Sequence, residues 1–368
     1  MIVLFLVILF QKGNYMTASK RNLSFDIARA IAIYLVIIGH SMTGLWDTWQ
    51  SNFIFAANLP IFFIISGYFY HSKRIKDVVQ TGVNTLLIPF FIVTLLYITL
   101  RTALGEIVQH VHYLNFQTLI PLIYGNGATG QSPFGFELSS HAGAVWFLPT
   151  MFIANIIFHW LMKSNKEIIR FTIVIILFGS GYSLAQVAYF PWSLQAALEV
   201  QIYYLFGYWL AKLVKQYSQK TIFANPYILL LSLICWILSA TSGSYELNRG
   251  LADNIFIAVL GGFGSAIVLL GIAFFIEKHW HQIAKGLSYV GQYSLVLLCV
   301  HSLDIGLLDT EVMNFLESQA WFSGYSLFAY LGLMLLRILY TTCFTWILLK
   351  IKFIYNLLVD RNFPLQKA

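Results

Sequence analysis

Long runs of apolar residues recur along the whole chain and are separated by short polar segments. A helix needs about 20 apolar residues to cross the roughly 30 Å core of a bilayer, whereas strands of an outer-membrane barrel alternate apolar and polar positions. These runs have the length of spanning helices and lack the alternation. We expect ten such helices, at about residues 24–45, 52–71, 82–104, 143–162, 169–188, 193–211, 227–241, 254–276, 287–308 and 322–349.

The composition supports an all-α polytopic membrane protein. Hydrophobic residues make up 59% of the 368 residues and charged residues 10%, against about 25% charged residues in a soluble domain. A soluble enzyme, a disordered chain and a disulfide scaffold are therefore excluded. The three cysteines lie inside apolar runs and have no disulfide or metal-binding spacing, so we expect no metal site.

The basic residues predict the orientation in the membrane. They lie between the apolar runs rather than along one face, so the net charge of +7 does not indicate nucleic-acid binding. With both termini in the cytoplasm, 18 of the 22 Lys and Arg residues fall on the cytoplasmic side, where membrane proteins concentrate them. We expect an N-terminal extension (1–19), a ten-helix membrane domain (20–350) and a short cytoplasmic tail (351–368).

One predicted outer loop is long. Residues 105–142 include the glycine-rich stretch Tyr124–Gly135, which has no phosphate-loop spacing. Long loops are usually functional or disordered. The alternatives are a flexible or re-entrant connector and a lid that faces the substrate.

Ionisable residues inside a span are expensive and are functional candidates by default. The candidates are Asp26, Arg29, His40, Glu199, His301, Asp304 and Arg337. Arg29 and His40 are eleven residues apart in the first run, which places them on one helix face with an axial separation of about 16.5 Å. Asp26 precedes Arg29 by three residues and can pair with it.

Other predicted helices bring polar groups to the depth of His40. His301 and Asp304 have the i, i+3 spacing that lets a carboxylate orient an imidazole. Such a pair suits general-base chemistry on a hydroxyl, and it equally suits a proton relay in a transporter. The further candidate contacts of a substrate are Asn58, His141, Trp146 and Glu199.

Several segments, taken in chain order, resemble one known family. They are SFDIARAIAIYLVIIGHS (24–41), NLPIFFIISGYFY (58–70), LLIPFF (86–91), AVWFLPTMF (144–152), QIYYLFGYWL (201–210) and GQYSLVLLCVHS (291–302). Together they are similar to the acyltransferase 3 family of integral membrane acyltransferases, whose first helix carries an Arg, ten residues and then a His. The details look closest to the fucose O-acetylase-like and surface-polysaccharide O-acetyltransferase branch.

The resemblance implies a reaction and a place for it. The donor would be acetyl-CoA or another short acyl-CoA on the cytoplasmic side of a bacterial plasma membrane, and the acceptor a hydroxyl of a surface or exported carbohydrate. Arg29, Arg74 and Lys76 would bind the anionic nucleotide end of the donor. His40 would be the general base, and His301 with Asp304 a second polar pair at the acceptor.

Two other classes fit the pattern of spans and charges. A polysaccharide exporter or flippase would contact sugar with its midplane polar groups and would not need acyl-CoA. A proton-coupled transporter would use His40, Glu199 and Asp304 as a relay. The absence of an internal repeat and the single-face Arg–His pair favour the acyltransferase.

Overall fold

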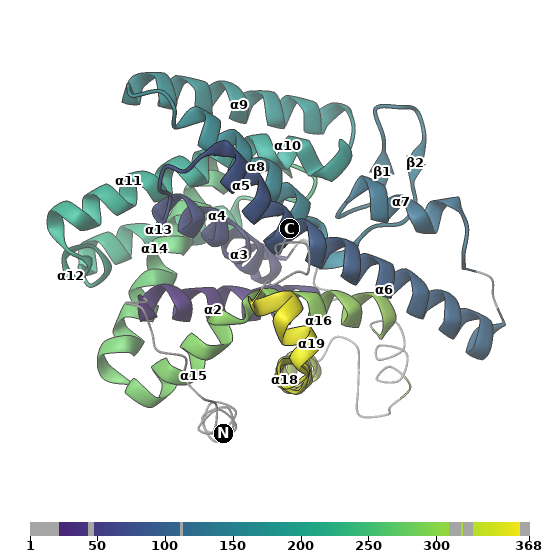
Figure 1. Cartoon of the computed structure of the whole chain (residues 1–368). Helices are drawn as coiled ribbons and strands as arrows, with labels where there is room; N and C mark the ends of the chain where they lie inside the picture. Colours follow the sequence, from purple (N-terminus) through teal and green to yellow (C-terminus); the bar gives the residue numbers. More distant parts are fainter. Residues whose placement is uncertain (1–21, 43–47, 111–112, 309–317, 319–326, 361–368) are drawn as a thin grey trace.

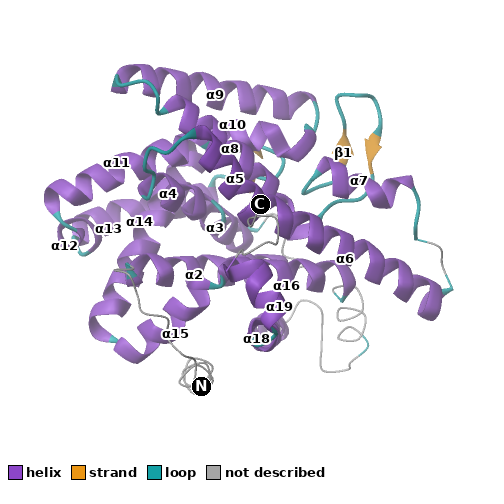
Figure 2. Ribbon diagram, in the orientation of Figure 1, coloured by secondary structure: helices purple, strands orange, loops and turns teal. Residues whose placement is uncertain are grey.

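Helices form most of the described chain, and its only strands are two short antiparallel hairpins (Figures 1 and 2). The structure, a computed structural model, describes residues 22–42, 48–110, 113–308, 318 and 327–360. The predicted extension (1–19) and the end of the predicted tail (361–368) lie outside the described residues. The predicted all-α class is confirmed for the described part.

The first half of the chain follows the predicted runs closely. Its elements are α2 (Leu23–His40), α3 (Trp49–Asn58), α4 (Pro60–Tyr68), α5 (Ile75–Gly82), the π-helical turn η1 (Val83–Leu87), α6 (Ile88–Leu104), the π-helical turn η2 (Gly105–Gln109), α7 (Phe116–Tyr124), β1 (Gly130–Gln131), β2 (Glu137–Leu138), the 3₁₀ turn η3 (Gly143–Trp146), α8 (Phe147–Leu161) and α9 (Glu167–Val187). The run 52–71 becomes two helices, because Pro60 has no N–H to donate to the preceding turn and starts a new helix.

The second half is more broken. It contains the 3₁₀ turn η4 (Pro191–Ser193), α10 (Leu194–Glu199), α11 (Gln201–Tyr217), α12 (Gln219–Phe223), α13 (Pro226–Thr241), β3 (Tyr245–Glu246), β4 (Leu251–Ala252), α14 (Ile255–His279), α15 (His281–Gln292), α16 (Ser294–Leu307), α18 (Leu327–Leu349), α19 (Lys352–Tyr355) and the π-helical turn η5 (Asn356–Asp360). The axes of α15 and α16 differ by 67° across the break at Tyr293. Beyond α18, Leu358 packs against Val296 of α16.

In the described residues, seven helical segments are long and apolar enough to cross a membrane, or eight if the bent pair α15–α16 counts as one span. The other two predicted spans correspond to α10–α11, which is interrupted at Val200, and to α13, which has 16 residues. The protein is therefore a multi-pass membrane protein, and the count of ten spans stays a prediction.

The long predicted loop 105–142 has secondary structure of its own. It contains α7 and the hairpin β1–β2, in which Gly130 pairs with Leu138. Asn115 caps α7 by accepting the Thr118 N–H, and Gly125 ends it in the left-handed conformation (φ 63°). The described part of the loop is thus a folded unit beside α6 (Figure 1).

Helix α2 is wrapped by other helices and positions the site. It contacts α3, α14, α15, α16 and α18. Most of its side chains are buried, and Arg29 and His40 are half-buried. The carbonyls of its last turn have no partner within the helix. The Ser41 hydroxyl donates to one of them, that of Ile37, at 2.8 Å.

Helices α4 and α11 touch backbone to backbone at two glycines. A Cβ on Gly67 would collide with the Tyr204 carbonyl, and a Cβ on Gly207 would collide with the Ile64 carbonyl. Small residues at matching positions let membrane helices approach closely and gain van der Waals contact. This contact fixes α4, and the preceding Asn58, relative to the aromatic residues of α11.

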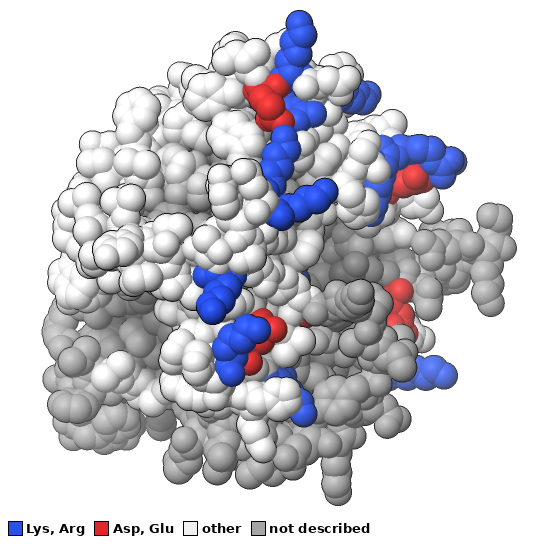
Figure 3. Space-filling model, turned by 90° about the vertical axis from the view of Figure 1, so that its left-hand side faces the viewer, with Lys and Arg blue, Asp and Glu red and all other residues white. Residues whose placement is uncertain are grey.

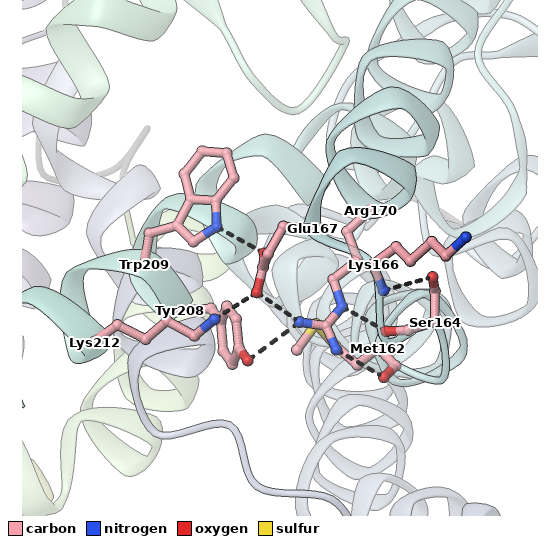
Figure 4. A network of polar contacts seen from close by, with 8 residues as sticks. All are labelled: Met162, Ser164, Lys166, Glu167, Arg170, Tyr208, Trp209 and Lys212. Carbon is pink, nitrogen blue, oxygen red and sulfur yellow. Dashed lines mark hydrogen bonds and ion pairs between the residues drawn. The ribbon is translucent and has the colours of Figure 1, made fainter.

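A polar network joins α8, α9 and α11 (Figure 4). The buried Arg170 donates to the carbonyls of Ser164 (2.8 Å) and Met162 (3.4 Å), which follow the end of α8, and to the Tyr208 hydroxyl (3.2 Å). Glu167, in the first turn of α9, pairs with Arg170 at 3.0 Å and also with Lys212 of α11. Arg170 thus provides donors for carbonyls that the end of α8 leaves unpaired.

One face of the molecule is rich in basic residues. Figure 3 shows Lys and Arg side chains gathered, among few acidic ones, on the face where α12 and the start of α2 lie in Figure 1. His40, at the opposite end of α2, is about 16.5 Å further along the helix axis than Arg29. Arg29 and His40 are therefore at different depths along α2.

Candidate active site

His40 is the last residue of α2, and its ring is held by its own helix. Nδ1 lies 2.8 Å from the main-chain carbonyl of Val36, one turn earlier. A carbonyl can only accept a hydrogen bond, so Nδ1 carries the proton and donates it. In the neutral ring Nε2 then has a free lone pair. His40 is therefore prepared to accept a proton at Nε2.

His301 and Asp304 of α16 lie behind His40. The rings of His301 and His40 meet edge to face, with centroids 5.2 Å apart. Nδ1 of His301 is 3.4 Å from a carboxylate oxygen of Asp304, and both side chains are almost completely buried (0% and 2% exposed). The i, i+3 spacing in one helix produces this pair, as the sequence predicts.

Arg337 and Tyr340 of α18 complete the cluster. Nε of Arg337 lies 3.7 Å from the Asp304 carboxylate, and its Nη1 donates to the main-chain carbonyl of His40 at 3.0 Å. The Tyr340 hydroxyl donates to the other oxygen of Asp304. The sequence identifies Arg337 as a charge inside a span but not its partners, and it gives no signal for Tyr340.

A cavity of about 330 Å³ opens in front of His40. Asn58 and Trp146, both predicted to contact a substrate, line it together with His40. Asn52, Glu246 and Asn248 line it too and were not predicted. The last two belong to the segment between α13 and α14, where a sequence offers no means of telling a cavity residue from an ordinary loop residue.

His141 lies at another cavity, of about 420 Å³, which Ser302 also lines. Its Nδ1 accepts the main-chain N–H of Gly143 at 3.1 Å, so the neutral ring carries its proton on Nε2. Surrounding protein atoms and then the charge of Arg101 lower the pKa of His141, which keeps the ring neutral. His141 thus lines a different cavity from His40, Asn58 and Trp146.

Glu199 ends α10 and is fully buried. Neither carboxylate oxygen has a hydrogen-bond partner among the described residues. Gly181 and Gly250 pack directly on the side chain, leaving no space for a Cβ. Glu199 is not among the residues that line the His40 cavity, although its neighbour Tyr245 is.

The predicted donor-binding residues are at the other end of α2. Arg29 pairs with the buried Asp26 at 2.9 Å and lies over the ring of Phe69, 5.8 Å from its centroid. Arg74 is exposed and pairs with Asp77 at 3.0 Å, and Lys76 is exposed in the same helix turn. Two of the three predicted donor-binding cations, Arg29 and Arg74, therefore already form ion pairs with Asp26 and Asp77.

The described residues contain no group of three or more His, Cys, Asp or Glu side chains that could hold a metal ion. The chemistry available at the cavity is thus that of an imidazole with a fixed tautomer, backed by a second imidazole, a carboxylate and a guanidinium. Such a set moves a proton on and off a hydroxyl.

The fold and this cluster define a multi-pass helical membrane protein with a cluster of His, Asp and Arg side chains beside a cavity. The chain belongs to the acyltransferase 3 family, whose model, described as an acyltransferase domain, matches residues 22–350. No curated protein and no solved structure matches the chain. The family makes the protein a membrane acyltransferase that uses an acyl donor and an acceptor.

Proposed function

We propose that the protein moves a short acyl group, most simply acetyl, from cytoplasmic acyl-CoA to a hydroxyl of a surface or exported carbohydrate. The observation that carries the proposal is the ring of His40. Its Nδ1–H is held by Val36, so a lone pair on Nε2 is available at a cavity of about 330 Å³. An O-acyltransferase needs a base of this kind to activate the acceptor hydroxyl.

The transfer step balances with this one base. Nε2 of His40 accepts the hydroxyl proton while the acceptor oxygen attacks the thioester carbonyl. The new acyl–oxygen bond forms as the acyl–sulfur bond breaks. The coenzyme leaves as a thiolate and takes the proton from His40, so the enzyme returns to its starting state.

His301, Asp304 and Arg337 act as positioning residues for His40. When Nε2 accepts a proton the ring becomes cationic, and Asp304 supplies a nearby negative charge that favours this state. Arg337 neutralises part of that charge and binds the carbonyl of His40, so α18 holds the end of α2 in place. The cluster therefore both adjusts the charge around His40 and fixes the position of the end of α2.

The donor approaches from the basic face. Ten spans with both termini in the cytoplasm would put Arg29, Arg74 and Lys76 on the cytoplasmic side. The diphosphate and 3′-phosphate of coenzyme A are suitable ligands for these cations. The pantetheine arm would then extend along α2 for the roughly 16.5 Å to His40.

The acceptor enters from the opposite side, which is the outer side of a bacterial plasma membrane. Asn58, Asn248 and Glu246 offer hydrogen bonds for sugar hydroxyls, and Trp146 offers a flat apolar surface for a sugar ring. Glu199, behind Tyr245, supports this wall from within. The fucose O-acetylase-like and surface-polysaccharide branch fits such an acceptor site.

Membership of an acyltransferase family favours acyl transfer over the exporter and the proton-coupled transporter. The direct test is incubation of the purified protein with radiolabelled acetyl-CoA and surface polysaccharide. Label in an alkali-labile ester on the polysaccharide supports the proposal. Sugar movement across vesicles without any ester, and without dependence on acyl-CoA, contradicts it.

A further inference from the structure

The cavity at His141 has walls of its own. It lies between α6, the segment that connects β2 to η3, and the end of α16, and has a volume of about 420 Å³. Among the side chains that line it are Tyr97, Arg101, Tyr113, Ser139, His141 and Ser302. Among the residues that the structure describes, none that lines this cavity is acidic.

Arg101 gives this cavity a positive charge. Its Nη1 donates to the Gly306 carbonyl at 3.0 Å, and its guanidinium lies over the ring of Tyr113, 4.8 Å from the centroid. Among the described residues it has no carboxylate partner, unlike Arg29, Arg74, Arg170, Arg249 and Arg337. Most of its N–H donors are therefore available to a ligand.

His141 adds a neutral donor. Because Nδ1 accepts from the Gly143 N–H, the proton of the ring is on Nε2. Hydroxyls of serine, threonine and tyrosine line the cavity too, beside apolar residues such as Ile98, Pro121 and Ile305. A cation, a ring N–H and many hydroxyls suit a ligand with an anionic group and several hydroxyls.

The cavity also lies close to the cluster of His40, His301 and Asp304. Ser302 follows His301 in α16, and its hydroxyl donates to the Ala142 carbonyl at 3.3 Å. Gly143 packs on the same hydroxyl, where an added Cβ would be 2.8 Å from Oγ. Across this thin wall Ala144 and Leu298 line the His40 cavity. The two cavities are therefore neighbours on either side of the Ala142–Ala144 segment.

We propose that this second cavity binds an anionic sugar residue of the acceptor, carrying a carboxylate or a phosphate, next to the residue that is acylated. The assignment rests on the proposed function in one respect, that the acceptor is a carbohydrate. The anionic group contacts Arg101, and the ring hydroxyls contact His141 and Ser302.

The test is a binding measurement without any acyl donor. The full chain in phosphatidylcholine nanodiscs is titrated with glucuronic acid, glucose 6-phosphate and glucose, and binding is followed by saturation-transfer NMR. At least one anionic sugar should bind at least tenfold more tightly than glucose. Arg101→Gln should remove that preference, Arg101→Lys should keep part of it, and Lys215→Gln, a charge change on an exposed residue at the end of α11, should leave it unchanged.

Three results would overturn the assignment. The first is equal binding of glucose and both anionic sugars to the wild type. The second is an undiminished preference for the anionic sugar in a folded Arg101→Gln variant. The third is loss of sugar binding when phosphatidylglycerol replaces phosphatidylcholine, which would identify a lipid headgroup as the ligand. The wild-type comparison stands even if Arg101→Gln fails to fold. Because no acyl-CoA is present, a failure of the acyl-transfer assay leaves this result intact, and the reverse also holds.

Discussion

Arg337 of α18 donates a hydrogen bond to the main-chain carbonyl of His40, 297 positions earlier in the chain, with a distance of 3.0 Å. The same guanidinium lies 3.7 Å from Asp304 and is completely buried. One side chain thus ties the end of α2, which carries the base, to the carboxylate of α16. Burying the charges of Arg337 and Asp304 costs desolvation energy, which their mutual attraction offsets only when both side chains are present.

Replacing Arg337 should therefore destabilise the fold as well as the site. Arg337→Met leaves Asp304 with a buried charge and one partner fewer, which typically costs about 3–5 kcal/mol. Thermal unfolding in detergent should show a marked fall in melting temperature. Adding Asp304→Asn to the same chain should recover part of the loss, because the buried charge is then gone. A melting temperature that Arg337→Met leaves unchanged would contradict the structure here.

Asp304 should affect the rate more than binding. Asp304→Asn removes the negative charge that favours the cationic state of His40, so kcat should fall while KM for both substrates changes little. The fall should be smaller than the roughly 10²–10⁴-fold loss expected on removing a general base. His301→Gln should behave likewise. If both variants keep wild-type kcat and stability, His301 and Asp304 do not act on His40 and only fill space in the core.

Arg29 should affect the donor. Arg29→Ala removes a charge-assisted contact worth about 1.5–3 kcal/mol, so KM for acyl-CoA should rise by about ten- to a hundredfold. Arg29→Lys should restore only part of the affinity. Because Asp26 is buried and paired with Arg29 at 2.9 Å, Asp26→Asn with Arg29→Ala is the control that separates lost binding from an unpaired carboxylate. An unchanged KM in both backgrounds would remove Arg29 from the donor site.

The contact between α4 and α11 gives a purely structural prediction. Gly207→Val forces a side chain against the Ile64 carbonyl, so the two helices must separate and the fold should lose stability. Gly179→Val is the matched control, since a Cβ there meets nothing within 4 Å. Melting temperatures of the two variants in detergent measure the difference. Equal stabilities would mean that the helices do not pack as described.

The sequence predicts much of this site because parts of it are local. Helical spacing alone puts Arg29 and His40 on one helix and brings Asp304 to His301. The predicted grouping of His141 with Asn58 and Trp146 did not come from spacing within one helix. In the structure, His141 lines one cavity, and Asn58 and Trp146 line the other. Their positions depend on how η3, α3 and the loop after α7 pack together.

The residues that the sequence does not bring together meet only through tertiary packing. Arg337 meets His40 and Asp304 only because α18 packs against α2 and α16. Glu246 and Asn248 reach the cavity through the segment around β3 and β4, whose residues read as an ordinary polar loop. The breaks at Leu59 and Tyr293 show the same limit, since hydropathy reports an apolar run but not a bend within it.

The central claim is that His40 is the base, and His40→Gln tests it most directly. Glutamine keeps the polar character and similar volume but cannot take up a proton at neutral pH, so transfer of radiolabel from acetyl-CoA to surface polysaccharide should fall by about 10²–10⁴-fold. Expression, melting temperature and acetyl-CoA binding should stay close to the wild type. His281→Gln, at an exposed histidine at the start of α15, is the matched control and should transfer normally. Wild-type acylation by a folded His40→Gln protein would contradict the account.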